Sequence, residues 1–273
     1  MIALTEDKRM LGYGVMTPYS NIFCFATTRR GGFSKGDYAS FNCTPYTGDD
    51  AESVRRNQEL LCNSMPQPPK ELVIPFQTHG TKVEVIDEKY LNATSDERTV
   101  MLQGVDALIT KEPGCCICIS TADCIPILLY DCKNQVVAAA HAGWRGTVNY
   151  IAGHTLDRMR ALYGTDGKDV IACIGPGISL PSFEVGEEVY EAFRMNGFAM
   201  DYISEWKPET HKHHIDLWAA SRMQLLDFGV PGEQIETSGI CTYMRHEEFF
   251  SARRLGIKSG RILSGIMIVD TKP

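Results

Sequence analysis

The sequence lacks any apolar run long enough to cross a membrane, which takes about 20 residues. Its apolar runs, such as IPILLY and VVAAA, are far shorter. The first ten residues, MIALTEDKRM, do not place an apolar stretch after a basic start, as a secretory signal does. We therefore expect a cytoplasmic protein with no membrane partner.

The sequence also has too little cysteine for a disulfide scaffold. Ten cysteines among 273 residues fall well below the roughly 8–10% that is typical of such scaffolds. No two CxxC pairs are present to form a local zinc finger. Cys115, Cys116 and Cys118 lie in one apolar run, where a free thiol behaves as a small apolar side chain. We expect the thiols to be reduced.

The sequence also has no excess of basic residues. Lys and Arg number 27 against 34 Asp and Glu, which gives a net charge of −7. This balance provides no bulk attraction for nucleic acid, so we expect no nucleic-acid partner. No internal repeat or low-complexity tract divides the chain, and the Pro-rich stretch at 65–71 is short. We expect a single domain over residues 1–273.

The apolar pattern predicts consecutive strands with helices set around them. Alternating or continuous apolar runs indicate strands at 21–28, 71–77, 104–114, 115–120, 125–131, 135–141, 169–175 and 262–270. Helical spacing and capping signals predict helices over 51–63 after Asp50, from a Thr147 cap to Gly164, over 184–196 and over 216–228. Residues 90–99 are largely polar, and we expect them to form a surface loop. The order of elements favours an α+β (mixed α/β) fold of layered β-sheets flanked by helices.

Three residues of metal-binding type stand at predicted strand ends. His79 lies in QTHG, Cys124 in STADCIPILLYD and His141 in HAGWRG. They are too far apart for a local finger, so only strands converging at one sheet edge could bring them together. Two imidazoles and a thiolate suit zinc or copper, and three protein ligands leave a fourth position open.

Each of these residues also has an ordinary structural interpretation. A single His at a strand end is commonly a hydrogen-bonded structural residue, and a single Cys is commonly part of a core. The neighbours favour a site, because Asp123 and Arg145 lie where simple packing would favour apolar residues.

Several blocks of the sequence resemble the YfiH-like family, also called the laccase-domain or polyphenol-oxidase family. In chain order from Thr27 to Arg261 they are TTRRGGFSKGDYASFN, QTHG, STADCIPILLYD, HAGWRG, IGPGIS with FEVG, CTY and FFSARR. Phe183 stands where the family commonly has tyrosine, and Ser259 where threonine is usual. Neither position is one of the expected metal ligands.

The resemblance implies a fold, a cofactor and an activity. It implies sheets between helical layers, related to a cysteine-hydrolase-like fold. It implies zinc, or copper, held by the residues that match the family's ligands: His79, Cys124 and His141. The implied reactions are phosphorolysis of adenosine, inosine, guanosine and methylthioadenosine, and deamination of adenosine. The implied partners are a purine nucleoside and phosphate, and the chain would be a monomer or a homodimer.

Candidate roles follow from the chemistry of these reactions. Deamination needs a proton-carrying acid near the metal, and Asp123 beside Cys124 is our candidate. Phosphorolysis needs a held phosphate, for which an arginine fork is suited; Arg145 is our first candidate and Arg29 our second. We expect Asn42 and Gln77 to hydrogen-bond the ribose or the base.

Three other functions stay open at this stage. Cys124 could be a catalytic nucleophile with His141 as its base, as in a Cys/His amidohydrolase acting on cell-wall precursors. A copper polyphenol oxidase (laccase) would need several coppers, and one His/Cys/His set is visible. A binding module with a structural metal would need a fourth protein ligand. We expect the HKHH stretch at 211–214 to be surface, and Arg253 and Arg254 to have structural roles.

Overall fold

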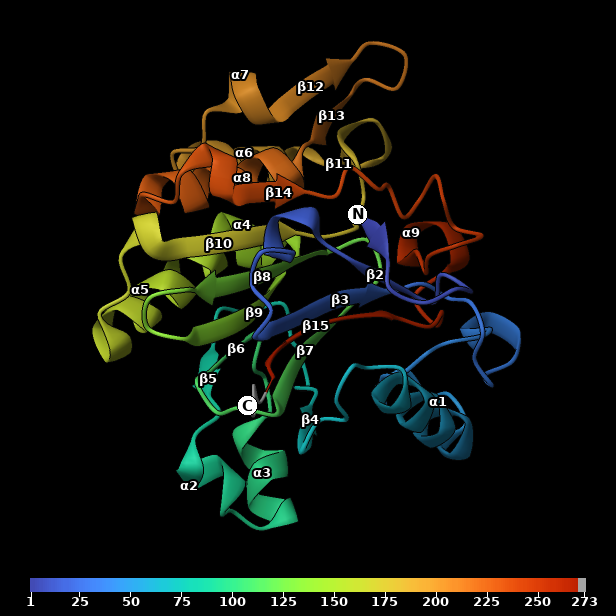
Figure 1. The fold of residues 1–273 in the computed structure, drawn as a ribbon. Coiled ribbons are helices and arrows are strands. Elements are labelled where there is room, and N and C mark those ends of the chain that lie inside the picture. The colour runs from blue at the N-terminus through green and yellow to red at the C-terminus, as the bar shows by residue number, and fades with distance from the viewer. Residues whose placement is uncertain (270–273) are drawn as a thin grey trace.

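Two six-stranded sheets lie face to face at the centre of the molecule, with helices on their outer sides (Figure 1). This arrangement is seen in a computed structural model that describes residues 1–269. The predicted α+β fold of layered sheets flanked by helices is confirmed. Among the described residues, no helix combines the length and the apolar character that a membrane crossing needs.

The first sheet brings together the two ends of the described chain. Its strands, in spatial order, are β1 (Ile2–Ala3), β2 (Met10–Gly12), β3 (Ile22–Thr27), β15 (Ile262–Ile268), β7 (Cys115–Thr121) and β4 (Glu71–Val73). Helix α1 (Ala51–Asn63) covers its outer face, where Leu61 packs with Phe25 and Cys118. The side chain of Asp50 caps α1 as the sequence predicted, accepting a hydrogen bond from the backbone N–H of Ser53.

The second sheet is buried on both faces along its central strands. Its order is β14 (Ile235–Thr237), β10 (Val170–Ile174), β8 (Ile125–Asp131), β9 (Val136–Ala142), β6 (Ala107–Thr110) and β5 (Val83–Val85). Side chains alternate along β8: Ile127 and Leu129 face the helices, whereas Leu128 and Tyr130 face the first sheet. Because both faces are buried, β8 and β9 read as continuous apolar runs.

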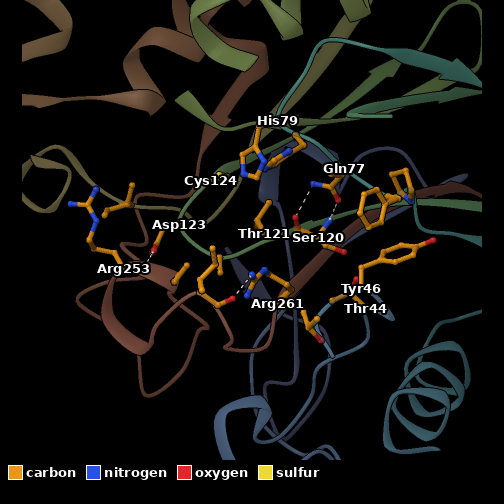
Figure 2. A pocket seen from close by; sticks show the side chains of 18 of the residues that line it. Thr44, Tyr46, Gln77, His79, Ser120, Thr121, Asp123, Cys124, Arg253 and Arg261 are labelled. Carbon is orange, nitrogen blue, oxygen red and sulfur yellow. Dashed lines mark hydrogen bonds between the residues drawn. The ribbon is translucent and has the colours of Figure 1, made fainter. Parts of the chain in front are cut away.

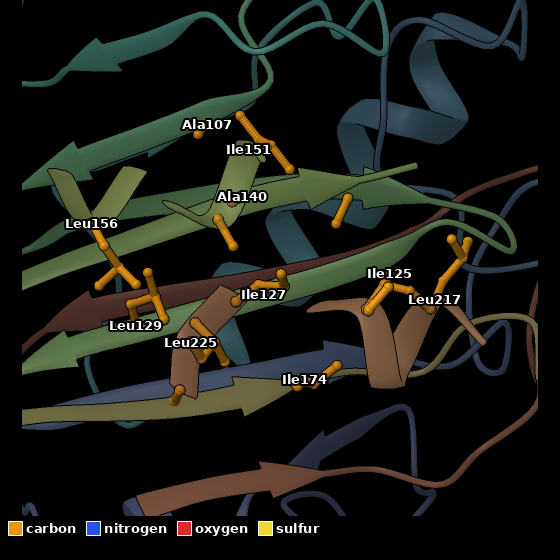
Figure 3. Close-up of a cluster of buried hydrophobic side chains, with 14 of the residues drawn as sticks. Ala107, Ile125, Ile127, Leu129, Ala140, Ile151, Leu156, Ile174, Leu217 and Leu225 are labelled. Atoms are coloured by element: carbon orange, nitrogen blue, oxygen red, sulfur yellow. The ribbon is translucent and has the colours of Figure 1, made fainter. Parts of the chain in front are cut away.

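Helices cover the outer face of the second sheet (Figure 3). They are α4 (Trp144–Val148), α5 (Ile151–Tyr163), α6 (Glu187–Met195) and α8 (Leu217–Phe228). Leu156 of α5 and Leu225 of α8 pack with Ile127 and Leu129 of β8, and all four are fully buried. This cluster joins the helical layer to the strands that carry the candidate site.

Shorter elements complete the fold. They are the three-stranded sheet β11 (Glu184–Val185), β13 (Lys212–Ile215) and β12 (Ser204–Lys207), with α2 (Glu88–Leu91), α3 (Ser95–Met101), α7 (Met200–Ile203), α9 (Ala252–Leu255) and the 3-10 turns Gly14–Met16, Gly36–Tyr38, Gly167–Asp169, Leu180–Ser182 and Gly232–Gln234.

The helix predicted from a Thr147 cap to Gly164 is two helices. Thr147 lies inside α4, and α5 begins at Ile151 after Tyr150, whose φ of 60° is left-handed. The start of α5 is capped from a distance, because Gln224 of α8 accepts hydrogen bonds from the backbone N–H groups of Ala152 and Gly153. No local pattern could reveal that cap. The predicted stop at Gly164 is confirmed, with φ of 73°.

Other boundaries also differ from the prediction. The strand predicted at 104–114 is shortened to β6, Ala107–Thr110. The stretch at 90–99 includes the start of α3, a capping box between Thr94 and Glu97 that the sequence shows as T-x-x-E. The strand predicted at 71–77 ends at Val73, shortly before Pro75. The helix predicted at 184–196 begins at Glu187, because the residues before it form β11. The last residue of the strand predicted at 262–270, Asp270, lies outside the described residues.

One of the short turns between the two central sheets connects β7 to β8. Strand β7 of the first sheet ends at Thr121, and β8 of the second sheet begins at Ile125. Cys124 lies in this turn. Strand β9 pairs with β8 so that His141 lies opposite Pro126, next to the turn. The crossing between the sheets therefore brings Cys124 and His141 to the same edge.

We predict that Leu225→Ala lowers the free energy of unfolding by about 2–5 kcal/mol, because it opens a cavity between α8 and the second sheet. Leu226 is the next residue of α8 but is 42% exposed, so Leu226→Ala should cost less than about 1 kcal/mol. Urea unfolding of both variants checks the pair, and equal losses would contradict the assigned packing.

Candidate metal and substrate site

His79, Cys124 and His141 come together at the edge where the two sheets meet. Their possible ligand atoms, the imidazole nitrogens and the Cys124 sulfur, all lie within 4.8 Å of one another. The two imidazole rings meet edge to face, with centroids 4.8 Å apart. His79 comes from the segment between β4 and β5, Cys124 from the β7–β8 turn and His141 from β9. His141 is buried, and His79 is exposed.

The backbone is unusual at His79 and at the residue before Cys124. His79 has φ of 63°, and Asp123, next to Cys124, has φ of 83°. Residues other than glycine rarely adopt left-handed φ, and such residues concentrate at functional sites. Gly143 follows His141 closely, and a Cβ on it would lie 2.9 Å from Cys124 Sγ and 3.0 Å from His79 Cδ2. The three donors thus occupy the space that a side chain at Gly143 would need.

The carboxylate of Asp106 holds two of the three donors. It is fully buried, and one oxygen lies 2.7 Å from Nδ1 of His141. The same carboxylate accepts hydrogen bonds from the backbone N–H groups of Thr78, His79 and Gly80. Burial raises the pKa of Asp106, but these bonds and the His141 imidazole outweigh burial and lower it. Asp106 therefore stays ionised and fixes the orientation of His141.

The thiol and the imidazoles shift one another's pKa values in the metal-free protein. Burial raises the pKa of the Cys124 thiol, but the imidazoles of His141 and His79 outweigh burial and lower it to about 6. Burial lowers the pKa of His141, but the charges of Cys124 and Asp106 and their hydrogen bonds raise it to about 9. Near neutral pH, Cys124 is a thiolate beside a protonated His141.

The three donors line a cavity of about 610 Å³. Figure 2 shows His79 and Cys124 on one side of it, Arg261 on the opposite side and Thr121 between them. The walls mix polar and apolar residues: Thr44, Tyr46, Thr47, Pro75, Phe76, Gln77, Ser120, Thr121, Ala122, Asp123, Ile178, Phe183, Ala252, Arg253, Ile257 and Arg261 complete the lining. The volume is that of a site for a small organic molecule.

Two of the other predicted site residues line this cavity, but their polar atoms are already engaged. Gln77 exchanges two hydrogen bonds with the backbone of Ser120, one through each atom of its amide. Both oxygens of Asp123 accept hydrogen bonds, one from the Thr242 hydroxyl and one from the backbone N–H of Arg253.

Three predicted substrate residues do not line the cavity. Arg145 is exposed at the start of α4, where its guanidinium stacks on Trp144 at 4.4 Å. Arg29 donates to the carbonyls of Ala39 and His246 and lies over Phe250. Asn42 is fully buried, and its Oδ1 accepts from the backbone N–H of Arg261. These three residues lie outside the lining of this cavity, and their substrate contacts stay predictions.

Sequence reasoning did not assign to the site several residues that border it. Asp106 lies in GVDALIT. An acidic residue at the start of an apolar strand was the one feature of the sequence that could have pointed to it. Arg253, for which the sequence predicted a structural role, lines the cavity. Arg261, which the sequence analysis did not single out, lines it as well. Tyr46 and Phe76 form an aromatic corner of its wall, with ring centroids 5.2 Å apart. Only the long-range fold brings these segments together.

The donor set fits a transition metal. Two imidazoles and one low-pKa thiolate are the ligands that zinc and copper take in proteins, and three protein ligands leave a position open. Within residues 1–269, this is the one group of three or more His, Cys, Asp or Glu residues arranged closely enough to hold an ion. A multi-copper centre would need further groups of that kind.

Known proteins resemble this chain over nearly its whole length. Residues 23–269 match the family described as multi-copper polyphenol oxidoreductase laccase. A purine nucleoside phosphorylase of Bacteroides thetaiotaomicron is 67% identical over 98% of this chain and 99% of its own. The adenosine deaminase RL5 of an unknown prokaryotic organism is 43% identical over 89% of this chain and 92% of its own.

A solved structure shares the fold. The crystal structure of the hypothetical protein YfiH of Bacillus licheniformis superposes with a TM-score of 0.84 at 28% sequence identity, covering 92% of this chain and 94% of that one. The sequence blocks, the layered sheets and the matched residues agree. The chain belongs to the multi-copper polyphenol oxidoreductase laccase family, the YfiH-like family that its sequence resembles.

Proposed function

We propose that this chain is a metal-dependent, cytoplasmic purine nucleoside phosphorylase that also deaminates adenosine. One observation carries the proposal: a His/Cys/His donor set opens into a nucleoside-sized cavity that Arg253 and Arg261 also line. The names of the two relatives, a purine nucleoside phosphorylase and an adenosine deaminase, support both activities. The proposed substrates are adenosine, inosine, guanosine and methylthioadenosine.

The proposed cofactor is zinc, with copper as the alternative, held by His79, Cys124 and His141. When bound with an open position, such a metal supplies Lewis-acid chemistry that activates water or polarises a substrate oxygen. The site is preorganised, because Asp106 binds Nδ1 of His141 and so leaves Nε2 as the nitrogen available to a metal.

Arg261 is the residue best placed to hold phosphate. Three hydrogen bonds from its guanidinium go to the carbonyls of Ile257, Ser259 and Gly260, so two of its five N–H groups remain free. Burial lowers the pKa of Arg261, and the charges of Cys124 and Asp123 oppose that effect. A fixed guanidinium with two free donors matches the oxygens of an anion.

Phosphorolysis needs that anion beside the sugar. A phosphate oxygen forms a bond to C1′ of the ribose while the bond from C1′ to the purine nitrogen breaks, and the departing base takes up the proton that the phosphate loses. Arg253, at another wall of the cavity, adds positive charge. The exposed rings of Tyr46 and Phe76 offer apolar surface for the purine.

A second candidate rests on the same residues without a metal. The low pKa of Cys124 and the adjacent His141 also describe an activated thiol, as in a Cys/His amidohydrolase acting on cell-wall precursors. A laccase reaction is not favoured, since the described residues offer one donor group where several coppers would be needed.

The first experiment compares products from adenosine with and without phosphate. The metal-loaded wild type should release adenine and ribose-1-phosphate only when phosphate is present, and inosine in either case. Cys124→Ala should lose both activities together with about one metal ion per chain, because it removes one of three ligands. Cys132→Ala, a half-buried thiol away from the cavity, is the matched control. The absence of nucleoside turnover in metal-loaded wild type would refute the proposal.

Asp106→Asn tests the support of His141. We expect metal affinity to fall by about 10–100-fold, the usual effect of removing a partner that orients a metal-ligating His. Competition with a coloured chelator measures the affinity. Asp157→Asn, at a side chain that is 66% exposed, should leave it unchanged. An unaltered affinity in Asp106→Asn would show that the carboxylate does not serve the metal site.

Thiol alkylation separates the metal ligand from the free nucleophile. In metal-free protein, iodoacetamide should modify Cys124 with a rate that rises with pH around a midpoint of about 6, since the thiolate forms above its pKa. Cys132, whose pKa is raised by burial and by Asp169 and Asp131, should react only at higher pH. Zinc should protect Cys124. Undiminished alkylation of zinc-loaded protein would favour the amidohydrolase.

A further inference from the structure

Asp123 makes three hydrogen bonds to parts of the chain that are distant in sequence. Its Oδ1 accepts from the Thr242 hydroxyl at 2.7 Å, and its Oδ2 accepts from the backbone N–H of Arg253 at 2.6 Å. Its backbone carbonyl accepts from the N–H of Ile178 at 2.8 Å. The residue is only 8% exposed. Every acceptor group of Asp123 is therefore bound to protein.

The backbone next to Cys124 is held tightly around this residue. Gly177 approaches so closely that a Cβ on it would lie 3.0 Å from the Asp123 carbonyl oxygen and 3.3 Å from that of Cys124. The left-handed φ of Asp123, 83°, turns its carboxylate away from the donors and toward Arg253, as Figure 2 shows. Asp123 thus has one end in the turn that carries a metal ligand and the other in the opposite wall.

That wall is the segment 242–261, which we call the arginine arm. It contributes Ala252, Arg253, Ile257 and Arg261 to the cavity. Its only helix, α9, has four residues, and Ile257 is 81% exposed. The arm is fixed at its start, where Thr242 donates its backbone N–H to the Gly177 carbonyl, and at its end, where Arg261 donates to Asn42. Between these ends, Phe249 and Phe250 are fully buried in an apolar cluster with Ala26 and Ile262. Asp123 holds the part of the arm that follows them, at Arg253.

We propose that Asp123 is a positioning residue that fixes the arginine arm relative to Cys124. The identity of the anion that the arm holds, phosphate, rests on the proposed function. Asp123 acts through the backbone of Arg253 and the hydroxyl of Thr242, and it carries no proton in the reaction. The same carboxylate that borders the metal ligand thereby sets the distance between the metal and the phosphate.

Asp123→Asn separates positioning from proton transfer. An asparagine can keep both bonds, because its amide oxygen can accept from the Arg253 N–H while its NH₂ donates to the Thr242 hydroxyl oxygen. Activity should therefore stay within about threefold of wild type. A proton-carrying acid would instead lose about 10²–10⁴-fold in kcat when made an amide, and that loss would overturn the proposal.

Asp123→Ala removes both bonds. We expect the KM for phosphate to rise about tenfold or more, with a smaller change in kcat, since buried donors in the arm lose their acceptor. Thr242→Val, which removes one bond, should give a smaller rise in KM and serves if Asp123→Ala does not fold. Asp201→Ala, at an exposed position in α7, is the control. An unchanged KM for phosphate in Asp123→Ala and Thr242→Val would overturn the proposal.

Hydrogen exchange of metal-loaded protein without substrate tests the hold of Asp123 on the arginine arm independently of any activity. Amides at 252–258 should exchange faster in Asp123→Ala, or in Thr242→Val, than in wild type, and Asp123→Asn should match wild type. If both Asp123→Ala and Thr242→Val exchanged these amides at the wild-type rate, the proposal that Asp123 fixes the arginine arm would be refuted. If the wild type turned over no nucleoside, the proposed function would fail, whereas the exchange pattern would still decide whether Asp123 holds the arm.

Discussion

The hydrogen bonds that converge on Asp106 determine how the candidate site is built. This buried carboxylate accepts from three successive backbone N–H groups, those of Thr78, His79 and Gly80, and from His141. A buried charge is tolerated only when it is well paired, and these four donors pair it. In return, the charge bends the 78–80 segment so that His79 faces His141. One acid thus organises two donors from separate segments.

The sheets supply the remaining constraint. Strands β7 and β8 belong to different layers, so the turn between them must cross the gap at its open edge. Cys124 is therefore held by the packing of both sheets, and little freedom is left to it. The arginine arm is anchored in the core by Phe249 and Phe250. Its part facing the cavity, residues 252–258, is exposed or half-buried and depends on polar contacts. A rigid donor set thus faces a wall that is less tightly packed.

Local patterns predicted those parts of the fold that depend on local chemistry. The apolar runs at 125–131 and 135–141, the Asp50 cap and the Gly164 stop all correspond to observed elements. The start of α5 did not, because its cap comes from Gln224 in another helix. The same distinction holds at the site. His79, Cys124 and His141 stand out in the sequence, whereas the surroundings of Arg253, Arg261 and Arg145 depend on packing between segments far apart in the chain.

Gly143 makes no bond to any of the three donors, yet the donors restrict what can occupy its position. The smallest side chain would place a carbon within 3.0 Å of both Cys124 and His79. Any larger residue would therefore have to displace Cys124 or His79 from the arrangement described here. Position 143 serves the donors by what it lacks, because the missing side chain leaves the room in which Cys124 and His79 approach each other.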